Sequence, residues 1–300
     1  MVEYIKRYLK ISDVEYKKEE SFKKISPVKI GGVASIVAYP RCEKELVELV
    51  SFLRDIGCKY RLLGRMSNVL PPDEKYDGVI IKTDKMRSAE VFGEYVMCDA
   101  GVALPHLAAI AREAALSGLE ELAGIPGSVG GAAVGNAGAF GREVSDVFVS
   151  ARCYFPKDDF ACVLHANDVS FDYRKSDLQK SDCLVLSCVF RLKTSNTTIV
   201  KTRMDEFRRL RNMSQPTGYP SLGSTFKRPC VGCSAGKLID ECGLKGFAIG
   251  GAIISEKHAG FIVNAGNASA SDYIKLSEYA AACVKSKFGI CLQREIEIMQ

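Results

Sequence analysis

Segments with a helical spacing of apolar residues alternate along the first part of the chain with short apolar runs typical of strands. Between residues 43 and 57 the apolar side chains recur every three or four positions, which predicts a helix that ends at Gly57. A second helix is expected to begin at Pro105 and to end at Gly118. Strands are expected at residues 28–39, 60–63, 78–83, 95–101, 147–155 and 183–192. The order of these elements is not that of a regular strand–helix–strand repeat.

A polar segment, TSNTT (194–198), is the best candidate for a domain boundary. Beyond it the pattern predicts a compact α+β region with its own helices and strands. Helices are expected at 201–212, near 235–242 and from Asp272 to about Phe288, and strands near 247–255, 259–264 and 291–299.

Composition narrows the class of protein without indicating its chemistry. The 300 residues are 47% hydrophobic and 26% charged, which is typical of a folded chain of about two domains. The net charge of +5 is too small and too evenly spread to favour nucleic acid, and no apolar run is long enough to span a membrane. The charged, amphipathic start is not a signal peptide, so the twelve cysteines are expected to be reduced thiols of a cytoplasmic protein.

Glycine is the residue whose distribution is uneven. Of 26 glycines, seven fall in GIPGSVGGAAVGNAGAFG (124–141), which is too flexible for a stable helix and is expected to form loops with at most short helical turns. Backbone N–H groups of such turns can bind phosphates, and Ser128 and Asn136 could add side-chain donors. The segment LGRMSN (63–68), with Ser67 and Asn68, has the same character, although a tight structural turn is an alternative for either segment. The chain contains neither a dinucleotide-binding G-x-G-x-x-G nor a P-loop, so a nucleotide would need another loop design.

Two further segments contain residues suited to catalysis. In SFDYRKSDL (170–178), Arg174 could bind a carboxylate or stabilise an enolate, although an arginine beside a strand is usually a solvated charge. In QPTGYPSLGSTFKRP (215–229), prolines and Gly223 would fix the direction of the Ser224 hydroxyl, although a serine here can be a simple turn former. Lys227 is a possible partner for a carboxylate or phosphate.

The cysteines and histidines do not form a recognisable metal site. Cys230-x-x-Cys233 has no second pair and no neighbouring histidine, so a structural role is favoured over metal or redox chemistry. The three histidines are far apart in sequence. His258 precedes an apolar strand and could line a site, but a structural histidine is the alternative.

Together these segments resemble one family, UDP-N-acetylenolpyruvoylglucosamine reductase, from about Ser26 to the C-terminus. The resemblance depends on several motifs in the same order, namely GIPGSVGGAAVGNAGAFGREVSD, FDYRKSDL, QP…YPSLGSTFKRP, AGKLIDECGLKGFAIGGAIISEKHAGFIVN and LQREIEI. The compact C-terminal region is similar to the form of the family that lacks an extra substrate-capping loop.

The resemblance implies an α+β protein with a two-part FAD-binding region of the FAD-linked oxidase type at residues 20–195, followed by a smaller substrate-binding α+β domain at residues 200–300. NADPH would reduce the flavin, which would then reduce the enolpyruvyl group of UDP-N-acetylglucosamine enolpyruvate to UDP-N-acetylmuramate for peptidoglycan synthesis. Ser224 would donate the proton, Arg174 and Glu295 would stabilise the enolate, and Tyr173, Lys227 and His258 would bind substrate. The implied FAD-binding residues are Gly64, Arg65, Met66, Ser67, Asn68, Gly124, Pro126, Gly127, Ser128, Gly130, Gly131, Asn136, Ala137 and Gly138. Glu295 is expected in a short strand whose alternation directs it to the same face as Glu297.

The sequence departs from the family pattern at a few positions. The first phosphate loop of the family usually reads G-x-G-S-N, and here Met66 replaces the second glycine. Met213 and Ser214 stand where a basic residue is common, and the proline that usually precedes Glu295 is missing. Two alternatives therefore stay open, namely another FAD-linked oxidoreductase on the same scaffold and a non-catalytic flavin- or nucleotide-binding paralogue. No nucleic-acid or membrane partner is expected, and a monomer is consistent with the sequence.

Overall fold

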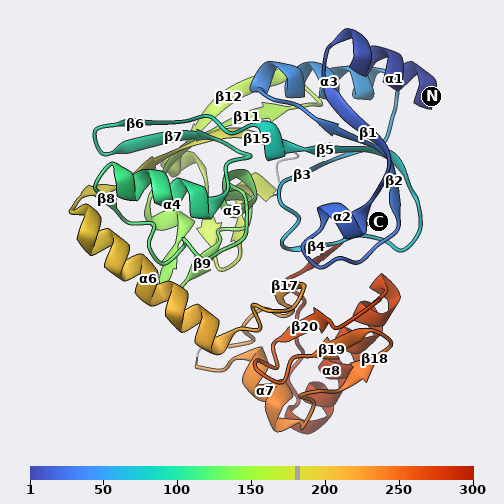
Figure 1. The fold of residues 1–300 in the computed structure, drawn as a ribbon, viewed down its shortest axis with the longest axis vertical. Coiled ribbons are helices and arrows are strands. Elements are labelled where there is room, and N and C mark those ends of the chain that lie inside the picture. Colours follow the sequence, from blue (N-terminus) through green and yellow to red (C-terminus); the bar gives the residue numbers. More distant parts are fainter. Residues whose placement is uncertain (180–182, 231) are drawn as a thin grey trace. The chain divides into compact units, whose positions relative to one another are not determined.

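The computed structural model describes residues 1–179, 183–230 and 232–300, and its chain folds into two compact units (Figure 1). The first unit comprises Met1–Lys18, Ile36–Arg65 and Asp77–Arg209. The second unit comprises Glu19–Ser35, Met66–Tyr76 and Leu210–Gln300. Both units contain helices and sheets, so the α+β class expected from the sequence is confirmed.

A four-stranded sheet with strand order β1-β2-β5-β3 begins the fold. Its strands are β1 (Glu15–Ser21), β2 (Val33–Tyr39), β3 (Tyr60–Leu63) and β5 (Tyr76–Lys82), and the helices that pack with it in the first unit are α1 (Val2–Ile11) and α3 (Glu43–Asp55). The apolar stripe of α3 is buried, as its spacing predicts. Strands β3 and β5 are parallel, with Leu63 opposite Lys82, so both strands end at the same edge of the sheet.

The second sheet of the first unit has five antiparallel strands in the order β12-β11-β15-β7-β6 (Figure 1). The strands are β6 (Ala89–Phe92), β7 (Tyr95–Asp99), β11 (Phe148–Phe155), β12 (Phe160–His165) and β15 (Leu184–Arg191). Helices α4 (Leu104–Glu113) and α5 (Val129–Val134) share its apolar core, and α6 (Thr197–Ser214) adds Val200 and Met204 to it. Short pairs complete the unit: β8 (Leu116–Ser117) with β16 (Lys193–Thr194), β9 (Gly138–Ala139) with β10 (Arg142–Glu143), and β13 (Phe171–Asp172) with β14 (Lys175–Ser176).

The second unit is built on a four-stranded sheet with strand order β17-β20-β19-β18. Its elements are α2 (Phe22–Ile25), β4 (Val69–Leu70), β17 (Ser221–Ser224), α7 (Ala235–Glu241), β18 (Ala248–Ile249), β19 (Ala252–Ile254), β20 (Phe261–Asn264), α8 (Ala270–Phe288) and β21 (Glu297–Ile298). Strand β21 pairs in parallel with β4. The Asp73 carboxylate accepts hydrogen bonds from the N–H groups of Ala270 (2.7 Å) and Ser271 (3.0 Å), so residues 66–76 are tied to the first turn of α8.

Three expected elements are shorter in the structure, each for a local reason. The strand expected at 28–39 begins only at Val33, because Lys29 and Gly31 have φ values of 54° and 109° that are incompatible with a strand. The helix expected to reach Gly118 ends at Glu113, because Ala115 turns with φ 56° into β8. The strand expected at 291–299 is wrong for most of its length, since only Glu297 and Ile298 are paired as a strand.

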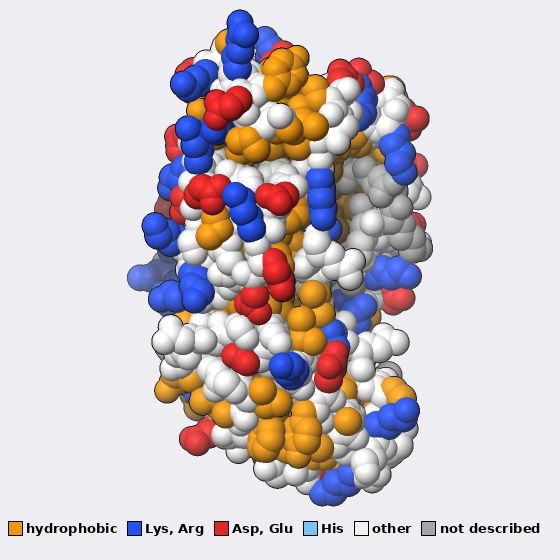
Figure 2. All heavy atoms as spheres, turned by 90° about the vertical axis from the view of Figure 1, so that its right-hand side faces the viewer, with side chains coloured by type: hydrophobic (Ala, Val, Ile, Leu, Met, Phe, Trp, Pro, Cys, Tyr) orange, Lys and Arg blue, Asp and Glu red, His pale blue; other side chains and the backbone are white. Residues whose placement is uncertain are grey.

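Charged side chains of both signs are interspersed over the face shown in Figure 2, with hydrophobic side chains between them. Over residues 1–179, 183–230 and 232–300, no helix combines the length and the apolar character that a membrane crossing requires.

Candidate functional site

The two predicted phosphate loops meet in the first unit at Gly64 and Ser128. A Cβ atom placed on Gly64 would lie 2.1 Å from the Ser128 Oγ, so only glycine allows this approach. Beside them, the Thr83 hydroxyl is buried and has no hydrogen-bond partner among the described residues. It lies 3.9 Å from that same Cβ position. Since buried hydroxyls are normally paired, the residues present fit a polar ligand such as FAD at this edge of the sheet.

Glycines 130 and 131 begin helix α5, and its first N–H groups are used within the fold. Val129 and Gly130 donate to the carbonyl oxygens of Val102 and Ala100, both at 2.8 Å, and Gly131 donates to the Ser128 Oγ at 3.4 Å. A Cβ on Gly130 would lie 2.8 Å from that of Ala100. Close packing is therefore one reason for glycine in this loop, which the sequence alone did not show.

The other residues of the glycine-rich loop differ in exposure. Gly124, Pro126 and Gly131 are exposed, whereas Gly127 is buried and its carbonyl accepts a hydrogen bond from Leu104 N–H at 3.0 Å. Ala137 is half-buried and donates to the Ala132 carbonyl at 2.9 Å. Only some residues of this loop, such as Gly124, Pro126 and Gly131, are therefore accessible to a ligand.

Arg174 is held against the end of this loop. It lies at the turn between β13 and β14 with φ 55°, and its Nη2 donates to the Gly138 carbonyl at 2.9 Å. A Cβ on Gly138 would lie 2.7 Å from the Arg142 carbonyl oxygen and 3.3 Å from the Nη1 of Arg174, so glycine is needed here mainly for the pairing with β10. The guanidinium also lies 5.0 Å from the centre of the Tyr173 ring and 3.9 Å from a Glu143 carboxylate oxygen.

Asn136 connects the glycine-rich loop with the turn that carries Arg174. Its amide nitrogen donates to the Glu143 carboxylate (2.8 Å) and to the Asp172 carbonyl (3.1 Å). Its oxygen accepts from Ser145 N–H at 3.0 Å, and the residue is buried. These contacts use both N–H donors of the amide and give Asn136 a positioning role in the structure, whereas its expected role as a donor to a ligand stays a prediction.

In the loop after β3, Arg65 is exposed, Ser67 is half-buried and Met66 is buried with φ 56°. That left-handed conformation is one that glycine adopts freely. Met66 therefore adopts a backbone conformation that suits glycine, although its side chain is buried.

Replacement of Met66 by glycine and by alanine is expected to separate these two features. Both variants lose the buried side chain, but glycine also relieves the left-handed backbone, so it should be the more stable by about 1 kcal/mol. Urea unfolding of the two variants measures this difference.

The buried Met204 in α6 provides the matched control. In a helix interior alanine should exceed glycine in stability by about 1 kcal/mol. The same order at position 66 would show that its backbone is not left-handed in solution.

In the second unit, Ser224 ends strand β17 after an irregularity in the pairing with β20. Ser221 lies opposite Val263 and Ser224 opposite Phe261, so β17 contains one extra residue, and Gly223 has φ 79°. Such bulges re-aim the following side chain. Ser224 is half-buried, and its backbone is fixed by the bulge. The prolines and the glycine of this segment predict such a fixed position.

The residue after Ser224 connects it with three other segments. The buried Thr225 has its Oγ1 3.0 Å from the Tyr273 hydroxyl of α8, and burial raises the pKa of Tyr273. Thr225 N–H donates to the Gly260 carbonyl at 2.8 Å, and the Thr225 carbonyl accepts from Glu295 N–H at 2.9 Å. Neither Thr225 nor Tyr273 was identified from the sequence, because the partners are 48 positions apart.

Glu295 thus lies beside the Ser224 turn, but not in the strand expected for it, since β21 begins at Glu297. The Asn68 side chain donates to the Glu295 carbonyl at 3.0 Å, and Glu297 N–H donates to the Asn68 carbonyl at 2.9 Å. Lys227 N–H donates to the Gln293 carbonyl at 2.9 Å. The second unit therefore brings together Asn68, Ser224, Lys227 and Glu295, which are far apart in sequence.

His258 lies just before strand β20. Its Nδ1 accepts from Gly260 N–H at 3.1 Å, and its ring packs edge-on against Phe261. Burial lowers the pKa of its imidazole. A Cβ on Gly236 of α7 would lie 3.0 Å from the His258 ring, so the histidine is closely packed.

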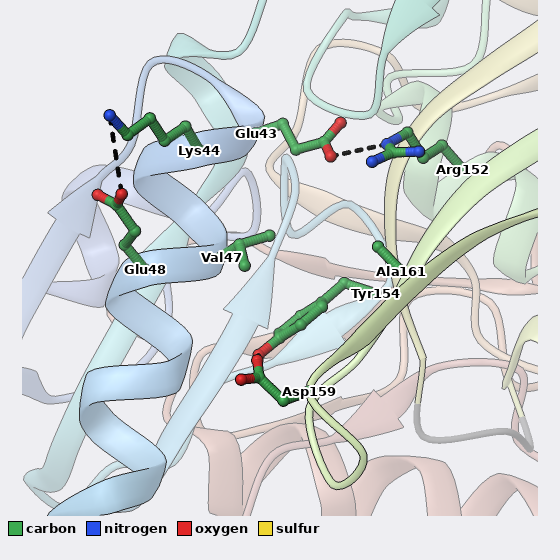
Figure 3. A pocket seen from close by; sticks show the side chains of 8 residues that line it. All are labelled: Glu43, Lys44, Val47, Glu48, Arg152, Tyr154, Asp159 and Ala161. Atoms are coloured by element: carbon green, nitrogen blue, oxygen red, sulfur yellow. Dashed lines mark hydrogen bonds and ion pairs between the residues drawn. The ribbon is translucent and has the colours of Figure 1, made fainter.

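A cavity of about 490 Å³ lies elsewhere in the first unit, between α3 and the strands β11 and β12 (Figure 3). Its walls contain the ion pair of Glu43 with Arg152 at 2.7 Å and the hydrogen bond from the Tyr154 hydroxyl to Asp159 at 2.6 Å. None of the predicted site residues lines it. Among the residues described, no group of three potential metal ligands occurs, and Cys230 and Cys233 are free thiols.

Comparison with known proteins connects both units to one family. Residues 215–299 match the model of the UDP-N-acetylenolpyruvoylglucosamine reductase C-terminal domain, and residues 34–159 match an FAD binding domain. The chain is 42% identical to the UDP-N-acetylenolpyruvoylglucosamine reductase of Caldicellulosiruptor bescii, covering 97% of this chain and 93% of the relative. It is also 42% identical to that of Enterococcus faecalis, covering 94% and 93%.

A solved structure agrees with these relatives. The crystal structure of the reductase from Thermus caldophilus superposes with a TM-score of 0.80 at 34% identity, covering 96% of this chain and 99% of that one. The resemblance inferred from the motifs is therefore confirmed. The chain belongs to the UDP-N-acetylenolpyruvoylglucosamine reductase family of FAD-dependent oxidoreductases.

Proposed function

We propose that this protein uses NADPH to reduce the enolpyruvyl group of UDP-N-acetylglucosamine enolpyruvate, giving UDP-N-acetylmuramate for peptidoglycan synthesis. The observation that carries the proposal is the position of Ser224, whose neighbour Thr225 accepts a hydrogen bond from Glu295 N–H. The chain that contains this arrangement is 42% identical to reductases of this name. We assign flavin binding to residues 20–195 and binding of the UDP-sugar to residues 200–300. We further propose that the reaction takes place in the cytoplasm, where its substrates are made, and that the partners of the protein are small molecules.

The Gly64–Asn68 loop and the 124–138 loop are proposed to hold FAD, with Gly64 and Ser128 at their meeting point. Bound FAD supplies the hydride chemistry that no side chain can perform. The protein residues bind and orient the substrate and control one proton.

Ser224 is proposed to protonate the substrate. Addition of hydride to the terminal methylene carbon leaves negative charge on the neighbouring carbon and its carboxylate. A serine is a weak acid, but a carbanion-like centre is far more basic and accepts its proton if the hydroxyl is held in place. The bulge of β17 and the hydrogen bonds of Thr225 provide that fixed position.

Arg174 and Glu295 are proposed to stabilise the enolate, with Tyr173, Lys227 and His258 binding the substrate. The guanidinium of Arg174 is always charged and can form two parallel hydrogen bonds to a carboxylate. Its contact with the Gly138 carbonyl fixes one side of the guanidinium.

The test is NADPH oxidation by the purified holoprotein with and without UDP-N-acetylglucosamine enolpyruvate, with UDP-N-acetylmuramate measured as the product. Continuous oxidation is expected only in the presence of the sugar. Flavin turnover that does not depend on the sugar would indicate another FAD-linked oxidoreductase. A protein that binds FAD without turning over would be a non-catalytic paralogue.

A further inference from the structure

Lys82, at the end of β5, is a buried lysine that the proposed chemistry does not use. It is 1% exposed, and Glu120 is the other charged residue that is buried in the described part of the chain. The Glu120 carboxylate is satisfied by Ser117 Oγ and by Gly118 N–H, both at 2.6 Å. Burial of an ammonium is costly unless it is paired and hydrogen-bonded, so a buried lysine calls for a structural or functional reason.

The ammonium of Lys82 binds the first residue of the phosphate loop. Its Nζ donates to the Gly64 carbonyl at 2.5 Å and lies 3.2 Å from the Asp84 carboxylate. Burial lowers the pKa of Lys82, and Asp84 acts in the opposite direction. The contact follows from the parallel pairing of β3 with β5, which places Lys82 where the loop begins.

This contact orients the peptide between Gly64 and Arg65. In a planar trans peptide the N–H points away from the carbonyl oxygen, so the Arg65 N–H faces away from Lys82. That N–H finds no acceptor within the described residues. Lys82 thus binds the inner side of a peptide whose donor is turned outward.

Thr83 provides a second, independent observation at the same place. Its hydroxyl is 3% exposed and lacks a partner among residues 1–179, 183–230 and 232–300. It lies 3.9 Å from a Cβ position on Gly64, next to Ser128. An unpaired buried hydroxyl destabilises a protein, which indicates that a ligand pairs with it.

We propose that Lys82 and Thr83 form an inner part of the FAD-binding site. The Thr83 hydroxyl hydrogen-bonds to bound FAD, and Lys82 is a positioning residue that holds the Gly64–Arg65 peptide with its N–H toward the cofactor. The inference rests on the proposed role of the Gly64 loop in binding FAD, and it adds two residues that do not belong to either glycine-rich loop.

Thr83→Val removes the hydroxyl and keeps the shape of the side chain. Apoprotein is titrated with FAD by flavin fluorescence, and its thermal midpoint is measured separately. The Kd for FAD is expected to rise about tenfold, the loss of one hydrogen bond, while the thermal midpoint of the apoprotein rises. Replacement of a purely structural threonine would instead leave the Kd for FAD unchanged and lower the thermal midpoint of the apoprotein. Thr225→Val is the control for this outcome, because the Thr225 hydroxyl is paired with Tyr273.

Lys82→Met tests the positioning residue by the same titration. The Kd for FAD is expected to rise about tenfold or more, and Lys85→Met, an exposed lysine paired with Glu15 in the same segment, should leave it unchanged. If Lys82→Met fails to fold, Thr83→Val still decides the proposal. If the wild-type protein binds FAD and Thr83→Val binds it with the same Kd, the inference is wrong and the proposed function is unaffected. If the wild-type protein does not bind FAD, the proposed function is wrong as well.

Discussion

Ser224→Ala is expected to lower the rate of UDP-N-acetylmuramate formation by about 10²- to 10⁴-fold, the range typical of a lost general acid. The hydride step needs no proton from this residue, so a single reduction of the protein-bound flavin by NADPH should keep its wild-type rate. The reason for the large effect is geometric. A water molecule that replaced the hydroxyl would not be held by the bulge after Gly223 or by the hydrogen bonds of Thr225.

Stopped-flow absorbance separates the two half-reactions of this variant. Ser221→Ala is the matched control, because Ser221 lies on the same strand, is also half-buried and pairs with Val263. It should leave both half-reactions near their wild-type rates. Equal loss of both half-reactions in Ser224→Ala would exclude the proton-donor role and indicate damage to the fold or to flavin binding.

Arg174→Met is expected to reduce the rate of the sugar-dependent half-reaction by about 10²- to 10³-fold, because it removes the fixed charge that answers the developing enolate. Arg174→Lys keeps the charge but loses the planar fork, so it should recover only part of the rate. Loss of the contact to the Gly138 carbonyl should have little effect on stability, since the residue lies at a turn.

Arg191→Met is the matched control for this prediction. Arg191 lies 5.8 Å from the centre of the Tyr95 ring and 3.7 Å from Glu94, in the same unit, so it has the same kinds of contact as Arg174. Its replacement should leave turnover within about twofold of wild type. A comparable loss in both variants would show that the effect of Arg174 is structural.

Local patterns in the sequence predicted most helices and strands, because the side chains at the apolar positions of each pattern are the ones that are buried in the core. The stripe of residues 43–57 became α3 with its apolar positions buried, and residues 60–63 became β3. The pattern failed where the backbone conformation of a single residue decides where an element begins or ends. Positive φ at Lys29 and Ala115 shortened one strand and one helix, and no periodicity reveals such a conformation in a residue other than glycine.

The candidate site was predicted as a set of residues but not as a set of contacts. The motifs identified Ser224, Glu295 and Asn68, and the structure joins them in one unit through hydrogen bonds between distant segments. Lys82 and Thr83 were missed because a lysine at the end of an apolar strand is normally expected to be exposed to solvent. Their burial depends on the pairing of β3 with β5, which is a contact between distant segments that no local pattern shows.

The contact of Asp73 with α8 has a consequence for synthesis of the chain. The first turn of α8 receives its acceptor, and β21 its partner β4, from residues made about 200 positions earlier. The second unit therefore cannot reach its final form while it leaves the ribosome unless those early residues have been kept accessible. For the same reason, an excised fragment 215–299 would leave two helix N–H groups and one strand edge without partners, because the stretch that matches the family model is shorter than the second compact unit.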